Sequence, residues 1–447
     1  MNKIKLFFIL CIFSQIFCIF ALDETSVLKL DLPLLDLPYQ LDAMDTVGHG
    51  FFSSYANPGM AQSLAVTTDI FSAFHFGMRV FYNSSNMNAV LRNVVYYAGT
   101  ALGDAVIFYL PFGNVTWMHE EFHRAVMSRY GVNSFNSIYT SEPFANTISV
   151  IHITDEDLIR FKAESPNDFI RMHEAGIESE NLLIDTLQNN NFFYNKNYFT
   201  ELVYWIPSIS SVAYIMSDGE KRDDEKTIAE RDFTGSDPIA WVYDLFKPDE
   251  PYTSRGTHAS GIGIDRYRTY DDLVDRERDY LKQVRIWQFA NFISPMMFGF
   301  KSLPWGKTDI RWNFTFRHYL TSFGTDLSLK LLLNINKLNF IAAYHNYQNH
   351  EHIFPAIEIE MIDYLVRIGN LGLYISPRIM LGMQPKEQIF YTPEAEFFGL
   401  ISSRVDFEIH KNWLPYLEIT GKTDGWAAGN EFLEKNIAVK LGISARF

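Results

Sequence analysis

The chain has 447 residues, a formal net charge of -15 and 16% aromatic residues. A surface this acidic repels nucleic-acid phosphates, so we expect no nucleic-acid partner. The length exceeds what one hydrophobic core usually spans, and two domains are therefore expected. High aromatic content at a mean hydropathy of -0.07 is typical of a β-barrel that faces lipid outside and water inside.

Residues 1–21 have the layout of a secretory signal peptide, in which two lysines precede an apolar run and a small residue ends it. The apolar run at 6–20 is shorter than the roughly 20 residues that span a bilayer, so cleavage is favoured over a retained anchor. Both cysteines, Cys11 and Cys18, lie in this segment. The mature chain is therefore expected to lack disulfides and thiolate metal ligands.

Residues 22–305 are predicted to form a mostly helical domain. The apolar stretch at 94–112 fits either a bilayer span or a buried helix, and its one acid, Asp104, is interpreted as a hydrogen-bonded core group. A short strand at 148–153 could hold a peptide substrate by strand addition. Further helices are predicted after the N-cap Thr154, at 169–187, at about 239–246 within the polar excursion 217–260, and from Thr269. An apolar segment containing Pro207 lies at 203–216.

After Lys307 the hydrophobic periodicity changes to two, which predicts β-strands. Polar and apolar residues alternate in about eight segments, near 310–316, 327–335, 338–344, 355–364, 371–381, 405–409, 413–419 and 436–447. A soluble sandwich would show the same alternation, but the last strand is apolar on one face and finishes on Phe447. This ending resembles the C-terminal signature of bacterial outer-membrane β-barrel proteins.

The resemblance implies an antiparallel barrel of about eight strands at 306–447 in an α+β chain, with outer-membrane lipid and the barrel-assembly machinery as partners. An even number of strands would place residues 22–305 in the periplasm.

The segment His119-Glu120-Glu121-Phe122-His123 is an HExxH motif. Residues four apart lie on one face of a helix, so His119 and His123 can hold one Zn²⁺ while Glu120 lies beside the metal-bound water. The motif resembles the active-site helix of zincin metallopeptidases, which implies peptide-bond hydrolysis with Glu120 as general base.

The longer segment 119–132 is also similar to the site-two protease family. The charged Glu121 and Arg124 depart from the usual zincin helix, and the Leu-Asp-Gly ligand motif of the site-two family is missing. In the gluzincin branch the third ligand is a downstream Glu. Glu180 is the first candidate and Glu178 and His173 are the alternatives, although each could be a solvated helix residue instead.

The sequence therefore predicts a zinc metallopeptidase anchored in the outer membrane, acting on a peptide or protein substrate. Two alternatives remain open. One is a non-enzymatic barrel protein with a fortuitous HExxH. The other is an inner-membrane protease in which 94–112 and 286–300 are spanning helices.

Overall fold

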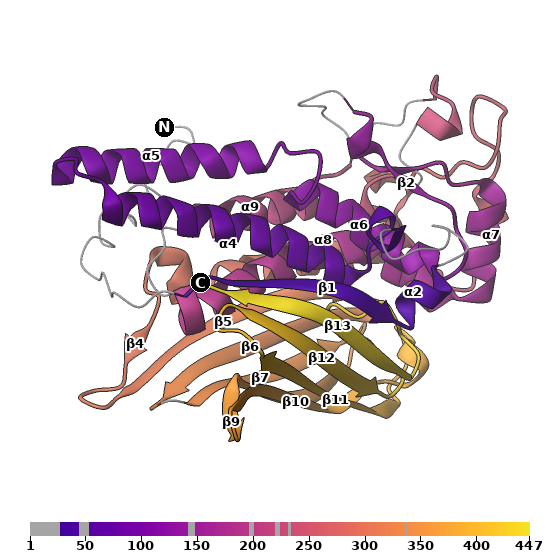
Figure 1. Cartoon of the computed structure of the whole chain (residues 1–447). Helices are drawn as coiled ribbons and strands as arrows, with labels where there is room; N and C mark the ends of the chain where they lie inside the picture. The colour runs from indigo at the N-terminus through magenta and orange to yellow at the C-terminus, as the bar shows by residue number, and fades with distance from the viewer. Residues whose placement is uncertain are drawn as a thin grey trace.

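A computed structural model describes residues 27–43, 53–141, 148–195, 201–219, 224–230, 234–336 and 338–447. The predicted signal peptide lies outside these residues. The described chain forms two layers, in which helices cover one face of a large antiparallel sheet (Figure 1). This arrangement confirms the α+β class.

The helical layer contains the site motif and the segments around it. Its main helices are α2 (Tyr39–Asp42), α4 (Met60–Ser84), α5 (Ala89–Ile107), α6 (Val115–Ser128), α7 (Asp155–Glu164), α8 (Pro166–Asn190), α9 (Glu201–Met216), α10 (Asp237–Phe246) and α11 (Asp275–Trp287), followed by the 3₁₀ helices η8 (Gln288–Phe292) and η9 (Pro295–Phe298). A small sheet pairs β2 (Phe135–Asn136) with β3 (Val150–Ile151).

The large sheet holds eleven strands within the described residues. They are β1 (Lys29–Leu37), β4 (Leu303–Pro304), β5 (Ile310–Thr321), β6 (Gly324–Ile335), β7 (Leu338–Gln348), β8 (Ile353–Ile362), β9 (Tyr364–Ile368), β10 (Leu371–Pro385), β11 (Ala395–Glu408), β12 (Trp413–Lys422) and β13 (Asn436–Arg446). Each of the eight predicted strand segments overlaps one of these strands.

The prediction of a closed barrel is wrong for the described part of the chain. The strands follow the order β1-β13-β12-β11-β10-β8-β7-β6-β5-β4, with β9 paired to β10, and β1 and β4 stay unpaired with each other. The sheet is therefore open. Its first strand, β1, comes from the region predicted as the helical domain and pairs antiparallel with β13. Periodicity after residue 307 could not reveal a partner strand that lies about 400 residues upstream of β13.

The hydrophobic core joins the two predicted regions. Trp117 and Phe122 of α6 belong to one buried cluster with Leu332 of β6 and Ile341 of β7. Polar contacts reinforce this packing, because Asp185 of α8 lies 2.8 Å from the guanidinium of Arg317 on β5 and 2.8 Å from the amine of Lys330 on β6. Helices α6 and α8 are thus held directly against the sheet.

Local signals place several helices where they were expected. The Thr154 hydroxyl accepts the backbone N–H of Asp157 at the start of α7, and the Asn114 side chain caps α6 in the same way. Asp104 is buried and lies 2.7 Å from His75, as expected of a hydrogen-bonded core group.

Within the described residues, none of the helices combines the length and apolar character needed to cross a membrane. The segment 286–300, which the inner-membrane alternative requires as one span, is divided among the end of α11, η8 and η9.

Candidate metal centre

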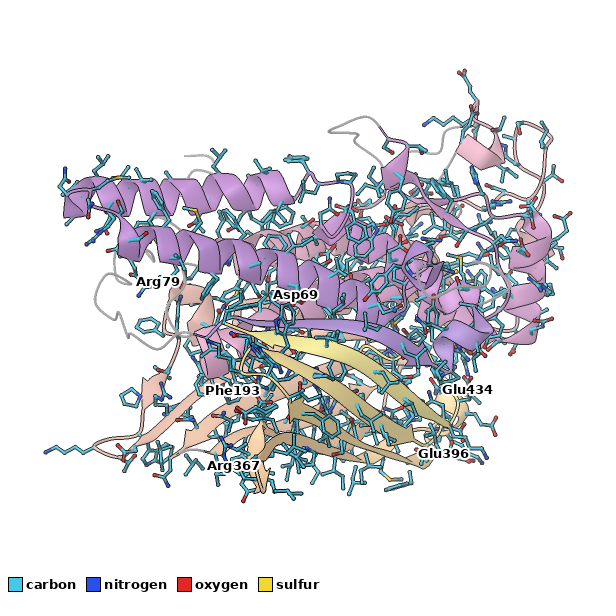
Figure 2. The ribbon with its side chains drawn as sticks, viewed as in Figure 1. Asp69, Arg79, Phe193, Arg367, Glu396 and Glu434 are labelled. Carbon is cyan, nitrogen blue, oxygen red and sulfur yellow. The ribbon has the colours of Figure 1, made fainter. Side chains whose placement is uncertain are left out.

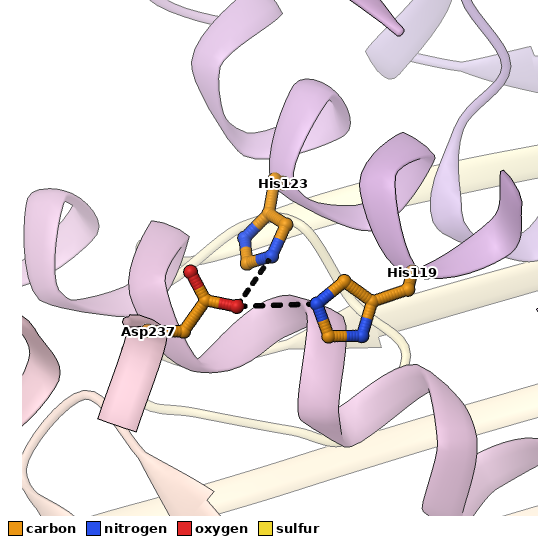
Figure 3. Close-up of side chains that lie close together, drawn as sticks. All are labelled: His119, His123 and Asp237. Carbon is orange, nitrogen blue, oxygen red and sulfur yellow. Dashed lines mark hydrogen bonds and ion pairs between the residues drawn. The ribbon is translucent and has the colours of Figure 1, made fainter. Parts of the chain in front are cut away.

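Three side chains from two distant segments converge in the helical layer. His119 and His123 project from successive turns of α6, and Asp237 stands at the start of α10 (Figure 3). Asp237 Oδ2 lies 3.1 Å from His119 Nε2 and 3.2 Å from His123 Nε2. All three residues are buried, and together they could hold a metal ion.

The second nitrogen of each imidazole is already engaged. His123 Nδ1 lies 2.6 Å from the carbonyl oxygen of Met172, which can only accept a hydrogen bond, so Nδ1 of His123 carries a proton. His119 Nδ1 lies 3.2 Å from Glu180 Oε1. Both rings are therefore oriented with Nε2 toward Asp237. Outer partners of this kind fix the ring orientation and tautomer of metal-binding histidines.

The charges of the group compensate one another. Burial disfavours the charged form of His119, but its hydrogen bonds to Asp237 and Glu180 outweigh burial and raise its pKa well above the usual value. Burial would raise the pKa of Asp237, whereas the imidazoles of His123 and His119 lower it far below its usual value. A divalent cation would take the place of the protons shared by these groups.

Helix α8 passes close to the converging nitrogens, and glycine is what allows it. A Cβ atom built on Gly176 would lie 2.4 Å from Nε2 of both His119 and His123. Such a contact is far inside van der Waals distance. The space in front of both nitrogens therefore depends on the missing side chain at position 176, as expected of a cradle for an ion.

Glu120 follows His119 on α6 and is also buried. Its carboxylate accepts a hydrogen bond from the backbone N–H of Val150 in β3, and burial raises its pKa to about 8. The short β2–β3 sheet, which overlaps the predicted strand at 148–153, thus stands beside the predicted base.

The two unusual charges of the motif have partners beneath the helix. Arg124 lies 2.5 Å from Glu121, and the Asn136 amide donates to the other oxygen of Glu121 at 3.0 Å. Both charged side chains are buried. These residues attach α6 to β2. They lie away from the side of α6 that carries His119 and His123, so their charges leave that side unchanged.

The sequence-based candidates for the third ligand occupy different places. Glu180 contacts Nδ1 of His119, the nitrogen that points away from the group. The carboxylate oxygen that lies close to Nε2 of both histidines belongs to Asp237. Glu178 pairs with the buried Arg171 and accepts the backbone N–H of Gly429 at 2.5 Å. His173 lies 2.9 Å from Asp244, which also pairs with Lys162 and Arg255 in a buried network.

Sequence reasoning missed Asp237 because it lies in a segment interpreted as a solvated excursion. The helix predicted at 239–246 is present as α10, which begins at Asp237. The signal that could have indicated Asp237 was an acidic residue in the first turn of that helix. Its approach to α6 depends on tertiary folding across more than 100 residues, which no local pattern reports.

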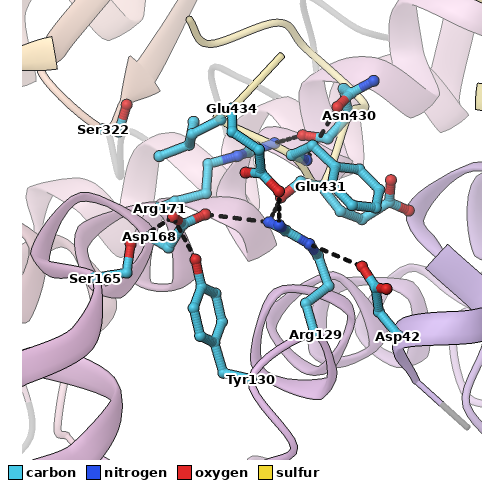
Figure 4. A network of polar contacts seen from close by, with 12 residues as sticks. Asp42, Arg129, Tyr130, Ser165, Asp168, Arg171, Ser322, Asn430, Glu431 and Glu434 are labelled. Atoms are coloured by element: carbon cyan, nitrogen blue, oxygen red, sulfur yellow. Dashed lines mark hydrogen bonds and ion pairs between the residues drawn. The ribbon is translucent and has the colours of Figure 1, made fainter. Parts of the chain in front are cut away.

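A polar network holds α6 and α8 in this position (Figure 4). Arg129, just after α6, donates to the backbone carbonyl of Glu431 at 2.8 Å and to Asp168 of α8 at 3.2 Å, and it also pairs with Glu434. The segment between β12 and β13 therefore fixes the end of the site helix. The Tyr214 ring of α9 lies 6.2 Å from the His119 ring, and its hydroxyl accepts the backbone N–H of Asp237 at 3.0 Å.

Comparisons with known proteins identify no relative of this chain. No protein-family model matches the sequence, and neither the curated proteins nor the solved structures give a significant match. The function is therefore argued from the geometry of the site.

Proposed function

We propose that this protein is a zinc metallopeptidase anchored in the bacterial outer membrane. The observation that carries the enzymatic part is the convergence of His119 Nε2, His123 Nε2 and Asp237 Oδ2, with Glu120 on the same helix as the two histidines. The general base and two of the three ligands are those that the HExxH motif predicts. The third ligand in this proposal is Asp237, and Glu180 orients His119.

The donor set favours zinc among the divalent ions. Two imidazole nitrogens and one carboxylate oxygen suit Zn²⁺, and three protein ligands leave a fourth position for water or substrate. Hard ions such as Mg²⁺ and Ca²⁺ prefer sites built from oxygen ligands alone. Zinc bound here would supply Lewis acidity toward a substrate carbonyl and lower the pKa of a water molecule.

The protein groups divide the remaining work among them. Glu120, held by the N–H of Val150, accepts the proton of the attacking water and passes it to the leaving amine. Glu180 and the Met172 carbonyl keep both imidazoles in the orientation that binding requires. Tyr214 stabilises the start of α10 and thereby the position of Asp237.

The membrane part of the proposal is supported by the polarity of the sheet. On β8 the outward side chains of Ile357 and Ile359 are more than half exposed, whereas Glu358 between them is buried against Arg378 and His345. Apolar side chains outside and charged ones inside is the pattern of a lipid-facing sheet. In a water-soluble sheet the charged side chains would face outward and the apolar side chains inward.

Metal content tests the proposal first. Purified protein supplied with zinc should hold about one Zn²⁺ per chain, and the double variant His119→Ala/His123→Ala should hold none, while the surface control His410→Ala keeps the metal. Absence of zinc from the folded wild-type protein would remove the enzymatic proposal.

Activity is tested separately with Glu120→Gln. This variant should keep its zinc and lose peptide hydrolysis by a factor of about 10²–10⁴, the usual contribution of a general base. A peptide library or unfolded protein is a suitable first substrate. Equal hydrolysis by the variant and the wild type would show that the activity does not arise at this site.

A further inference from the structure

The open edge at β1 is covered by a helix. The backbone N–H of Asp31 donates to both carboxylate oxygens of Asp69 on α4, at 3.1 and 2.9 Å, and the Pro33 carbonyl accepts from Tyr55 at 2.5 Å. Figure 2 places Asp69 where α4 lies over β1. Side chains of the helical layer thus take the place of a neighbouring strand.

At the opposite edge, the two-residue strand β4 pairs only with Arg311 and Trp312 of β5, and the rest of β5 is covered by helical segments. The N–H of Phe316 donates to the carbonyl of Ile293 at 3.0 Å, and the N–H of His318 donates to the Asn291 side chain at 2.7 Å. Both acceptors belong to the segment 286–300 that contains η8 and η9. That segment is tied to α9, since Trp205 donates to the Met297 carbonyl at 2.8 Å.

Helices that pack on one another connect the two edges of the sheet. Helix α5 packs on α4 and on α9, and α9 packs on η8 and η9. We call this set, α4, α5, α9 and residues 286–300, the helical wall. It continues around the molecule from one edge of the sheet to the other.

The helical wall has the same inverted polarity as the sheet. The exposed residues of α5 are all apolar: Ala89, Val90, Leu91, Val94, Ala98, Leu102, Ala105 and Val106. The acid of this helix, Asp104, points inward to His75, and the inward face of α4 also buries Arg79. Large exposed apolar side chains continue along 286–300: Ile286, Trp287, Phe289, Ile293, Phe298 and Phe300.

We propose that the helical wall contacts the acyl chains of a lipid bilayer and completes the lipid-facing surface that the open sheet begins. This inference rests on the proposed outer-membrane location and deepens it. An unpaired strand edge cannot face hydrocarbon, because each unsatisfied backbone group there costs several kcal/mol. Here four of those groups, on Asp31, Pro33, Phe316 and His318, are satisfied by side chains or backbone of the helical layer, which allows the sheet to stay open in lipid.

Lipid is favoured over a protein partner by the form of the surface. The exposed apolar side chains lie on two unrelated architectures, strands and helices, which share only their position around one interior. The exposed apolar face of α5 also continues along nearly the whole helix, from Ala89 to Val106. A protein partner would cover a local patch instead.

The test uses single cysteines, because the sequence contains only Cys11 and Cys18, which are replaced by serine. A nitroxide is attached in turn at Val94 and Leu102 of α5, at Ile359 of β8 as the sheet reference, and at Ile262 in the 256–264 loop as the aqueous reference. These side chains are 57%, 68%, 52% and 61% exposed, so the labels are matched in surface exposure. The protein is reconstituted into phospholipid vesicles, and collisions with oxygen and with a water-soluble nickel chelate are measured.

The expected result is that Val94, Leu102 and Ile359 favour oxygen by a factor of several, whereas Ile262 favours the nickel chelate. If labels at Val94 and Leu102 favour the nickel chelate while the label at Ile359 favours oxygen, the lipid contact of the helical wall is overturned and the membrane anchor stands. Nickel accessibility at all four positions would overturn the membrane anchor itself. Zinc content of each labelled protein confirms that its fold is retained.

Discussion

Helix α7 and strand β8 both alternate between apolar and charged side chains, yet they turn opposite faces to the interior. On α7, Leu158 and Phe161 are buried while Arg160 is exposed. On β8, Glu358 is buried while Ile359 is exposed. Apart from Lys162, which is buried in a pair with Asp244, α7 thus follows the pattern of proteins in water, and β8 has the pattern of a lipid-facing strand.

This difference shows that amphipathic periodicity identifies a two-faced element without saying which face is inside. The neighbours of the charged side chain decide it. Glu358 accepts two hydrogen bonds from Arg378, at 2.9 and 3.1 Å, and so belongs to a compensated interior network. Five variants can break or sharpen the comparison between the two regions.

The largest effect is expected from Glu358→Ala. Removing this carboxylate leaves Arg378 and His345 without their shared buried partner, which should lower the free energy of unfolding by about 3–5 kcal/mol. Glu351→Ala, at a side chain 72% exposed, is the control and should change it by less than about 0.5 kcal/mol. Similar values for both variants in chemical unfolding would mean that the sheet interior tolerates unpaired charge.

Ile359→Lys tests the other face of the same strand. If lipid covers this face, the lysine should lower the free energy of unfolding from vesicles by about 2–4 kcal/mol. Ile262→Lys, at a similarly exposed loop position, should change it by less than about 0.5 kcal/mol. An equally small effect of Ile359→Lys would place water, rather than lipid, outside the sheet.

Gly176→Ala tests the interior of the helical region. The added methyl would overlap Nε2 of both histidines, so zinc affinity should fall by about 100-fold or more. Gly77→Ala on α4 is the matched control, since a Cβ there meets nothing within 4 Å. Isothermal titration with zinc measures both. Unchanged affinity in Gly176→Ala would mean that the ion binds elsewhere.

Glu180→Gln separates an orienting residue from a ligand. Because Glu180 contacts the outer nitrogen of His119, its amide variant should lower zinc affinity by about 10–100-fold. Asp237→Asn should lower it further. The reverse order, with Glu180→Gln the more severe variant, would restore Glu180 as the third ligand and displace Asp237.

The smallest effect is a pH dependence. Burial lowers the pKa of His173, although Asp244 opposes this shift. Below about pH 6.5 the unfolded chain therefore binds a proton that the folded chain does not, and the free energy of unfolding falls by at most about 1.4 kcal/mol per pH unit. His173→Gln should make this slope shallower in urea unfolding between pH 5 and 7. His410→Gln should leave the slope unchanged, and an unchanged slope in both would contradict the assignment.

Much of the fold could be predicted because its signals are local. The period-two segments after Lys307, the cap at Thr154 and the position of α8, expected at 169–187, all depend on neighbouring residues. The open sheet could not be predicted, because β1 pairs with β13 across the whole described chain.

The site divides along the same line. His119, Glu120 and His123 lie within five residues, so one helix brings them together. Asp237 joins them only when α10 packs beside α6, and the sequence offers many other acids. The apolar stretch at 94–112 likewise predicted a helix, but its one-sided exposure comes from the partners that α4 and α9 provide.

The convergence of His123 and Asp237 also has a mechanical meaning. These residues are 237 - 123 = 114 positions apart, and an ion held by both would close a loop of that length. The entropy cost of such a closure is met by the ion's bonds when α10 docks, so binding and docking are linked. Chelation would then release α10 from α6, and the region between them would become the first part of the molecule open to proteolysis.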